Sequence, residues 1–181
     1  GTVATTDQPI ALGSSTGSTT AGPVPVTLAA YTTLATGTAD LTLTGNLDGA
    51  FSLDLDSTGV TTLAAGVGQT TELTALSTNA GGSTVLGGDS LAVSGALSFG
   101  DAVSTTTSTT LSSASLTTDS TLAAGSHALT IVTDAIALGG TTSGTSTLAL
   151  RPATAGTTIG LAGGAGDLNL DATEIAFLED G

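Results

Sequence analysis

The chain has 181 residues and a formal net charge of −14, because 15 Asp and Glu residues face a single Arg and no Lys. One cation provides no basic surface for a phosphate backbone or for anionic lipid, which excludes nucleic acid as a partner and electrostatic membrane attachment. The absence of Cys excludes disulfides, thiolate metal sites and thiol nucleophiles. With one His and neither Lys nor Cys, the chain lacks the side chains for most known catalytic sites, so we expect that it is not an enzyme.

The composition also indicates a location. No apolar run reaches the roughly 18 residues of a membrane-spanning helix, so we expect no membrane insertion. The chain opens on a polar segment at Gly1 and contains no Met, which indicates a processed or excised piece of a longer protein. An acidic, Cys-free chain with 58 Ser or Thr residues is typical of secreted bacterial proteins, so we predict an extracellular or cell-surface location.

The first 25 residues differ from the rest of the chain. Residues 13–22 are mostly Ser, Thr and Gly, and Pro23 and Pro25 follow them. Two prolines so close together disfavour the interior of a sheet. We therefore interpret residues 1–25 as an N-terminal segment or linker, and residues 26–181 as the regular part of the chain.

From Val26 onward, apolar and polar residues alternate with the period of a β-strand, and no helical period persists for three turns. Nine short segments show the alternation: 41–43, 53–55, 91–93, 97–99, 129–131, 136–138, 148–150, 159–161 and 168–170. Gly-rich turns separate many of them. Such short strands at steps of about 6–12 residues fit either a sandwich or barrel, or a β-solenoid.

Three features favour the solenoid. The strands are short for a sandwich core, aromatic residues make up only 2% of the chain, and the turns carry a hairpin dipeptide only at Asp48-Gly49. A narrow coil has room mainly for Leu, Val, Ala and Thr. At about 20 residues per coil, 181 residues give about nine coils. We therefore predict an all-β parallel solenoid of about nine coils, with residues 26–181 as the rod.

The C-terminal residues permit two structures. Asp171 and Glu174 have the spacing of a helix N-cap and its reciprocal partner, with Gly181 as the stop signal. Ile175 and Phe177 alternate equally well as a strand.

Two segments resemble repeats of very large bacterial exoproteins of the filamentous-haemagglutinin type. The first, at 68–88, reads GQTTELTALSTNAGGSTVLGG and is followed by Gly95 and by Asp101-Ala-Val103; the second, at 148–170, reads LALRPATAGTTIGLAGGAGDLNL. The resemblance implies a right-handed parallel β-helix, export across a Gram-negative outer membrane, and an adhesive or matrix role without catalytic residues. The N-terminal secretion domain of that family is missing, which leaves the secretion route open.

Carboxylates supply the only metal-site candidates. Asp54 and Asp56 share one face of a strand with Asp48 nearby, and Ca²⁺ takes about six to eight oxygen ligands. Residues 163–170 resemble a Ca²⁺-binding nonapeptide, although Asp167 comes one residue early. The competing interpretation is a solvated acidic face. His127 and Arg151 lack matching catalytic partners, and we interpret His127 as a turn or surface residue and Arg151 as the structural partner of a carboxylate.

We therefore expect a structural or adhesive rod of a secreted exoprotein that contributes to an extracellular filament or biofilm matrix. Its expected partners are further coils, through head-to-tail self-association or a longer solenoid, and glycans or host and matrix surfaces. The alternative is a glycan- or ice-binding solenoid with outward Thr ladders, drawn from Thr105 to Thr107, Thr109 and Thr110, and Thr117 and Thr118.

Overall fold

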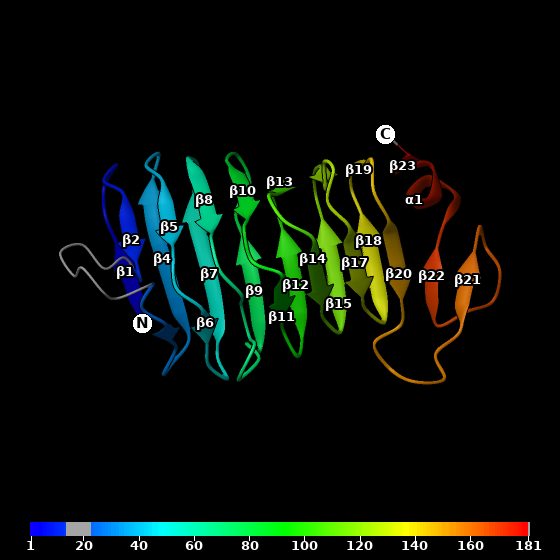
Figure 1. Ribbon diagram of the computed structural model, residues 1–181, viewed down its shortest axis with the longest axis horizontal. Helices are drawn as coiled ribbons and strands as arrows, with labels where there is room; N and C mark the ends of the chain where they lie inside the picture. Colours follow the sequence, from blue (N-terminus) through cyan, green and yellow to red (C-terminus); the bar gives the residue numbers. More distant parts are fainter. Residues whose placement is uncertain (14–22, 181) are drawn as a thin grey trace.

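The chain winds into a parallel β-solenoid, as Figure 1 shows for the computed structural model. Residues 1–13 and 23–180 are described. Every strand pairing among them is parallel, and all except one pair near the C-terminus join one coil to the next. The predicted all-β solenoid is thereby confirmed, and its right-handed winding stays a prediction.

Three sheets, here called A, B and C, run along the stack. Sheet A contains β1 (Thr2–Ala4), β4 (Thr32–Gly37), β7 (Ser52–Ser57), β9 (Ala75–Thr78), β12 (Ala96–Phe99), β15 (Ser115–Thr118) and β18 (Ala135–Leu138). Sheet B contains β2 (Ile10–Leu12), β5 (Leu41–Leu43), β8 (Val60–Leu63), β10 (Ser83–Leu86), β13 (Ala102–Thr105), β16 (Leu122–Ala123), β19 (Thr142–Gly144) and β23 (Leu178–Asp180). Sheet C contains β3 (Val26–Thr27), β6 (Leu47–Asp48), β11 (Ser90–Ala92), β14 (Thr109–Ser112), β17 (Leu129–Val132) and β20 (Leu148–Arg151), with single bridges through Val67 joining β6 to β11.

The coil length follows from the register of sheet A. Leu53 pairs with Leu76, Leu76 with Leu97, Leu97 with Leu116 and Leu116 with Ile136, so the same position recurs at nearly equal steps along the chain. These steps confirm the expected coil length. The expected number of nine coils is too high, because about six turns form.

The two ends of the chain explain the smaller number. Thr2 pairs with Thr33, so the first coil contains about one and a half times as many residues as each later coil. After β20, the chain forms the separate pair β21 (Ile159–Leu161) and β22 (Leu168–Leu170) and the helix α1 (Ala172–Ala176), instead of a further full coil.

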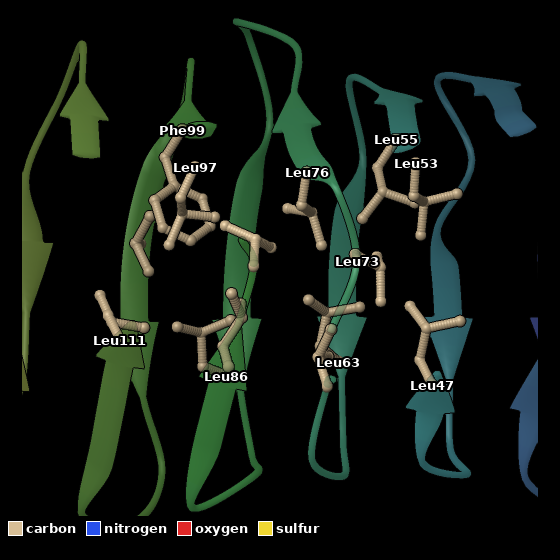
Figure 2. Close-up of a cluster of buried hydrophobic side chains, with 14 of the residues drawn as sticks. Leu47, Leu53, Leu55, Leu63, Leu73, Leu76, Leu86, Leu97, Phe99 and Leu111 are labelled. Carbon is tan, nitrogen blue, oxygen red and sulfur yellow. The ribbon is translucent and has the colours of Figure 1, made fainter. Parts of the chain in front are cut away.

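Ladders of leucine fill the interior of the coil (Figure 2). The side chains of Leu53, Leu76 and Leu97 stack along sheet A, and each is at most 1% exposed. Leu63 and Leu86 stack on sheet B. Because strands of neighbouring coils lie about 4.8 Å apart, each side chain contacts its equivalent in the coils above and below it.

Threonine lines the interior as well as the surface. Thr61 and Thr84 pair on sheet B and are 1% and 0% exposed, and Thr118 on sheet A is 1% exposed. Thr is close in volume to Val and favours strands, so it fits a narrow coil. The Thr84 hydroxyl donates to Asp101, whereas the buried Thr118 hydroxyl has no partner among the described residues. The strands at 83–86, 109–112 and 115–118 escaped prediction for this reason, because their inward residues include Thr.

Tight corners between sheets A and B require glycine. A Cβ atom on Gly82 would lie 2.4 Å from the carbonyl oxygen of Gly59, and one on Gly139 would lie 2.6 Å from that of Thr118. Both neighbours are backbone atoms of the preceding coil, so they cannot move aside without opening the stack.

The solenoid begins earlier than expected. Residues 1–12, interpreted above as part of a terminal segment or linker, contribute β1 and β2, which pair with β4 and β5. Val3 and Ile10 supply the inward apolar residues, and the sequence did not show this because the two strands are so short. The Ser/Thr/Gly stretch at 14–22 lies outside the described residues.

The C-terminal helix has the predicted N-cap. The Asp171 carboxylate accepts from the N–H groups of Thr173 and Glu174 at 2.7 and 2.8 Å, and the Glu174 carboxylate accepts from the Asp171 N–H at 3.0 Å. The helix includes Ile175, so the strand alternative was wrong there. Gly181 lies outside the described residues. Because the other Glu174 oxygen accepts from Leu138 N–H at 3.1 Å, the helix is anchored to the edge of β18.

We predict that Leu97→Ala destabilises the fold by about 2–5 kcal/mol, because it opens a cavity in the middle of a ladder. Leu161→Ala is the matched control, since Leu161 is 60% exposed, and it should have little effect. Urea unfolding followed by circular dichroism measures both. Equal effects of the two substitutions would contradict the ladder.

Candidate functional site

Exposed carboxylates bind backbone and hydroxyl groups of the neighbouring coil. Asp134 accepts from the N–H groups of Ala153 and Thr154 at 2.9 and 2.8 Å and from the Thr154 hydroxyl at 2.6 Å. Asp7 accepts from the Thr38 N–H and hydroxyl at 2.9 and 2.8 Å. These donors favour the ionised form, so the Thr154 hydroxyl and N–H lower the pKa of Asp134, and the Thr38 N–H and hydroxyl lower the pKa of Asp7.

The structure separates the calcium candidates. Asp48 lies on β6 of sheet C, where its carboxylate accepts from the N–H groups of Thr70 and Thr71 at 2.8 and 3.1 Å. Asp54 and Asp56 lie together on the outer face of sheet A, as predicted. Asp54 accepts from the hydroxyls of Tyr31 and Ser77, which lie on the coils before and after it.

Asp167 closes a local turn. Its carboxylate accepts from the Thr158 N–H and hydroxyl at 3.2 and 3.1 Å, which fixes β22 beside β21. Within residues 1–13 and 23–180, no group of three or more His, Asp or Glu side chains is placed to hold a metal ion. Calcium binding stays a prediction.

Asp101 is a buried carboxylate, only 3% exposed, that the sequence did not single out as a site. It lies between β12 and β13, and it accepts from the hydroxyls of Thr78 and Thr84 on the preceding coil, both at 3.0 Å. Burial raises the pKa of Asp101, and the two hydroxyl donors offset part of that increase. In the sequence, Asp101 lies in a turn between two segments with apolar alternation. The exposed acidic residues of other turns have the same pattern, so the sequence does not distinguish Asp101 from them.

His127 and Arg151 lie on successive coils, before β17 and at the end of β20. His127 occupies the bend before β17, where its backbone N–H donates to the Ala124 carbonyl at 3.0 Å. Arg151 is exposed at the end of β20. The turn location expected for His127 is confirmed.

On the strands that the structure describes, outward threonines form no long row. On sheet B, Thr42 pairs with Thr62, and Val85 comes next. On sheet C, Thr110 pairs with Thr130, between Ser90 and Ala149. Of the threonines named for a ladder, Thr105, Thr109 and Thr118 are buried. Ice or glycan binding through Thr ladders stays a prediction.

The first coil leaves apolar interior uncovered. Val3 pairs with Leu34 and thus continues the inward ladder of Leu34 and Leu55, yet it is 50% exposed. In the described part of the chain, β1, β2 and β3 each have one neighbouring strand. Among residues 1–13 and 23–180, no strand pairs with their other edges, and an edge without a strand partner presents free N–H and carbonyl groups.

The opposite end is partly covered. The pair β21–β22 follows β18 and β20 along the stack, and α1 lies beside it (Figure 1). The edge of β20 has a strand on one side only, among the residues described. A hollow of about 280 Å³ opens there, and Gly144, Ser146, Leu148, Leu178 and Glu179 line it.

Comparison of the chain with protein families, with curated proteins and with solved structures found no match. The single helix in the described ranges has five residues, and none there has the length and apolar character needed to cross a membrane.

We predict opposite pH responses for two Asn substitutions. The raised pKa of Asp101 means that its contribution to stability is most favourable below the ordinary value of 3.8 and is lost as pH rises through the folded-state pKa. Asp101→Asn should therefore gain stability relative to the parent chain as pH rises from 3.5 to about 7. Urea unfolding at both pH values measures it.

Asp134→Asn is the comparison. The pKa of Asp134 is lowered, so its contribution is present above 3.8 and is lost as pH falls through the folded-state pKa. The free energy of unfolding of this variant should therefore fall further below that of the parent chain at pH 7 than at acidic pH. A response of the same sign in both variants would contradict the contrast between a buried and an exposed carboxylate.

Proposed function

We propose that the chain is a structural rod segment of a secreted bacterial exoprotein, with a mechanical and adhesive role in an extracellular filament or matrix and no catalytic step. The extracellular location and the adhesive role rest on composition and on the resemblance to filamentous-haemagglutinin-type repeats. The solenoid architecture is compatible with them, because a stack of equal coils gives length and stiffness from short repeats.

The observation that carries the proposal is the uncovered ladder at the first coil. Val3 presents an inward-facing apolar side chain to solvent, and beside it β1 presents a strand edge that no other described strand pairs with. A further coil placed there would cover Val3 and pair the edge in the same way as every coil within the stack. The rod therefore extends at this end, by coils of a longer chain or by a second copy.

The opposite end offers a complementary surface for a second copy. The hollow between β20 and β23 has Leu148 and Leu178 in its lining, and Leu148 is 37% exposed. Contact between unlike ends is a heterologous interface, which repeats into an open filament. The net charge of −14 opposes contact between rod sides, so end contacts are favoured over lateral ones.

We predict that the full chain associates end to end as its concentration rises, and that Val3→Asp weakens this association about a hundredfold, because a carboxylate would be buried without a cation. Sedimentation velocity over a concentration series measures the effect. Val60→Asp is the matched control, since Val60 is 38% exposed on the side of sheet B.

A chain that stays monomeric at all concentrations would contradict self-association. Association that Val60→Asp weakens as much as Val3→Asp would place the contact on the side of the rod. Electron microscopy of associated material then distinguishes filaments from lateral clusters.

A further inference from the structure

Two of the four aromatic side chains of this protein lie in solvent at neighbouring positions. The chain has one Tyr and three Phe, and Tyr31 is 51% exposed and Phe51 40% exposed, whereas Phe99 is fully buried in the core. An exposed aromatic ring has not been removed from water by folding, so neither ring contributes its full apolar surface to the core.

Both aromatic residues lie directly before strands of sheet A, at the same corner of the coil. Tyr31 directly precedes β4, Phe51 directly precedes β7, and the two strands are paired with Thr32 opposite Leu53. The separation of the two aromatic residues along the chain is close to one coil. The register places Tyr31 opposite Ser52, so Tyr31 and Phe51 lie on successive coils and are offset by one residue.

Hydrogen bonds hold the Tyr31 side chain against the outer face of the sheet. Its hydroxyl donates to the Asp54 carboxylate on the next coil and accepts from the Thr33 hydroxyl at 3.1 Å. The Ser77 hydroxyl donates to the other Asp54 oxygen from the coil beyond. Asp56 lies two residues further along β7 and is exposed. The outer face thus combines the Tyr31 ring with hydroxyls and carboxylates that follow one another from coil to coil, and Phe51 is exposed at the corner directly before β7.

The charge of this face limits what it can bind. It carries Asp54 and Asp56, and the only Arg of the chain is on β20, near the opposite end of the stack. An anionic ligand would meet uncompensated repulsion. A purely apolar ligand would leave the carboxylates and hydroxyls of the face without partners as it excluded water.

A neutral sugar satisfies both kinds of group. A pyranose ring presents C–H groups on its face, which pack on an aromatic ring, and hydroxyls on its rim, which donate to carboxylates. A flat face that spans several coils suits an extended polysaccharide, because small molecules are usually held in concave pockets. We propose that Tyr31, Phe51, Asp54 and Asp56 form a binding face for neutral polysaccharide on the outside of sheet A.

This proposal goes beyond the rod function and is independent of it, since a chain that never associates end to end can still bind polysaccharide. It also differs from a Thr ladder, because the aromatic rings make the stacking contacts. Failure of one proposal therefore leaves the other standing.

Affinity electrophoresis of the full chain in native gels tests it. The gels contain hydroxyethylcellulose, galactomannan or dextran, with polygalacturonate as an anionic comparison. We expect at least one neutral polysaccharide to retard the parent chain and polygalacturonate to have no effect. Retardation should persist in chelator, because no metal ion is involved. Failure of all three neutral polymers to retard the chain, or equal retardation by polygalacturonate, would overturn the proposal.

Substitutions then locate the contact. Phe51→Leu keeps apolar volume but removes the aromatic face, and Tyr31→Ala with Phe51→Leu should weaken binding about tenfold. Tyr31→Phe keeps the ring and should retain most of the binding. Ile159→Ala is the matched control, because Ile159 is 44% exposed at the other end of the chain. Thermal melting verifies that each variant is folded, and a folded double variant that binds like the parent chain would overturn the assignment.

Discussion

The structure depends on in-register parallel pairing between equivalent positions of successive coils. Leu53, Leu76, Leu97 and Leu116 occupy the same place on sheet A because each coil repeats the path of the one before it. At a separation of about 4.8 Å, each inward residue must pack directly against the equivalent residues of the coils before and after it. This requirement explains the aliphatic interior, the small aromatic content and the glycines at corners such as Gly82 and Gly139, where the backbones of two coils are in contact.

The same pairing gives the acidic residues their structural partners. Because the chain has a single Arg and no Lys, most carboxylates cannot form ion pairs. Asp48, Asp54 and Asp134 instead accept hydrogen bonds from N–H or hydroxyl groups about one coil away in sequence. Asp101 does so inside the corner, where burial opposes its charge. The carboxylates thus connect neighbouring coils and at the same time keep rod sides apart by repulsion.

The sequence could predict the fold class and the strands with apolar alternation, because apolar residues, mostly Leu and Ile, recur with period two at the nine segments. All nine segments overlap strands of the structure. It could not reveal strands whose inward positions hold Thr, such as Thr84 and Thr118, because Thr is equally common on strand surfaces. The number of coils was overestimated because the long first coil and the separate C-terminal pair do not follow the repeat. For the sites, periodicity correctly placed Asp54 and Asp56 on one face. The separation of Asp48 from these two residues could not be predicted without knowing which sheet β6 joins. The proximity of Tyr31 and Phe51 could not be predicted without the register of β4 and β7.

A distance measurement along the stack tests the central claim of equal, in-register coils most directly. The chain has no Cys, so spin labels attach only to cysteines introduced by Thr42→Cys and Ser143→Cys on the outer face of sheet B. The register leads from Thr42 through Thr62, Val85, Ser104 and Ala123 to Ser143, which is five steps. Pulsed electron paramagnetic resonance should give about 24 Å between the two positions, and about 5 Å less when the second label moves to Ala123→Cys. A broad distribution, or a distance that does not shorten by one coil step, would contradict the stacked solenoid.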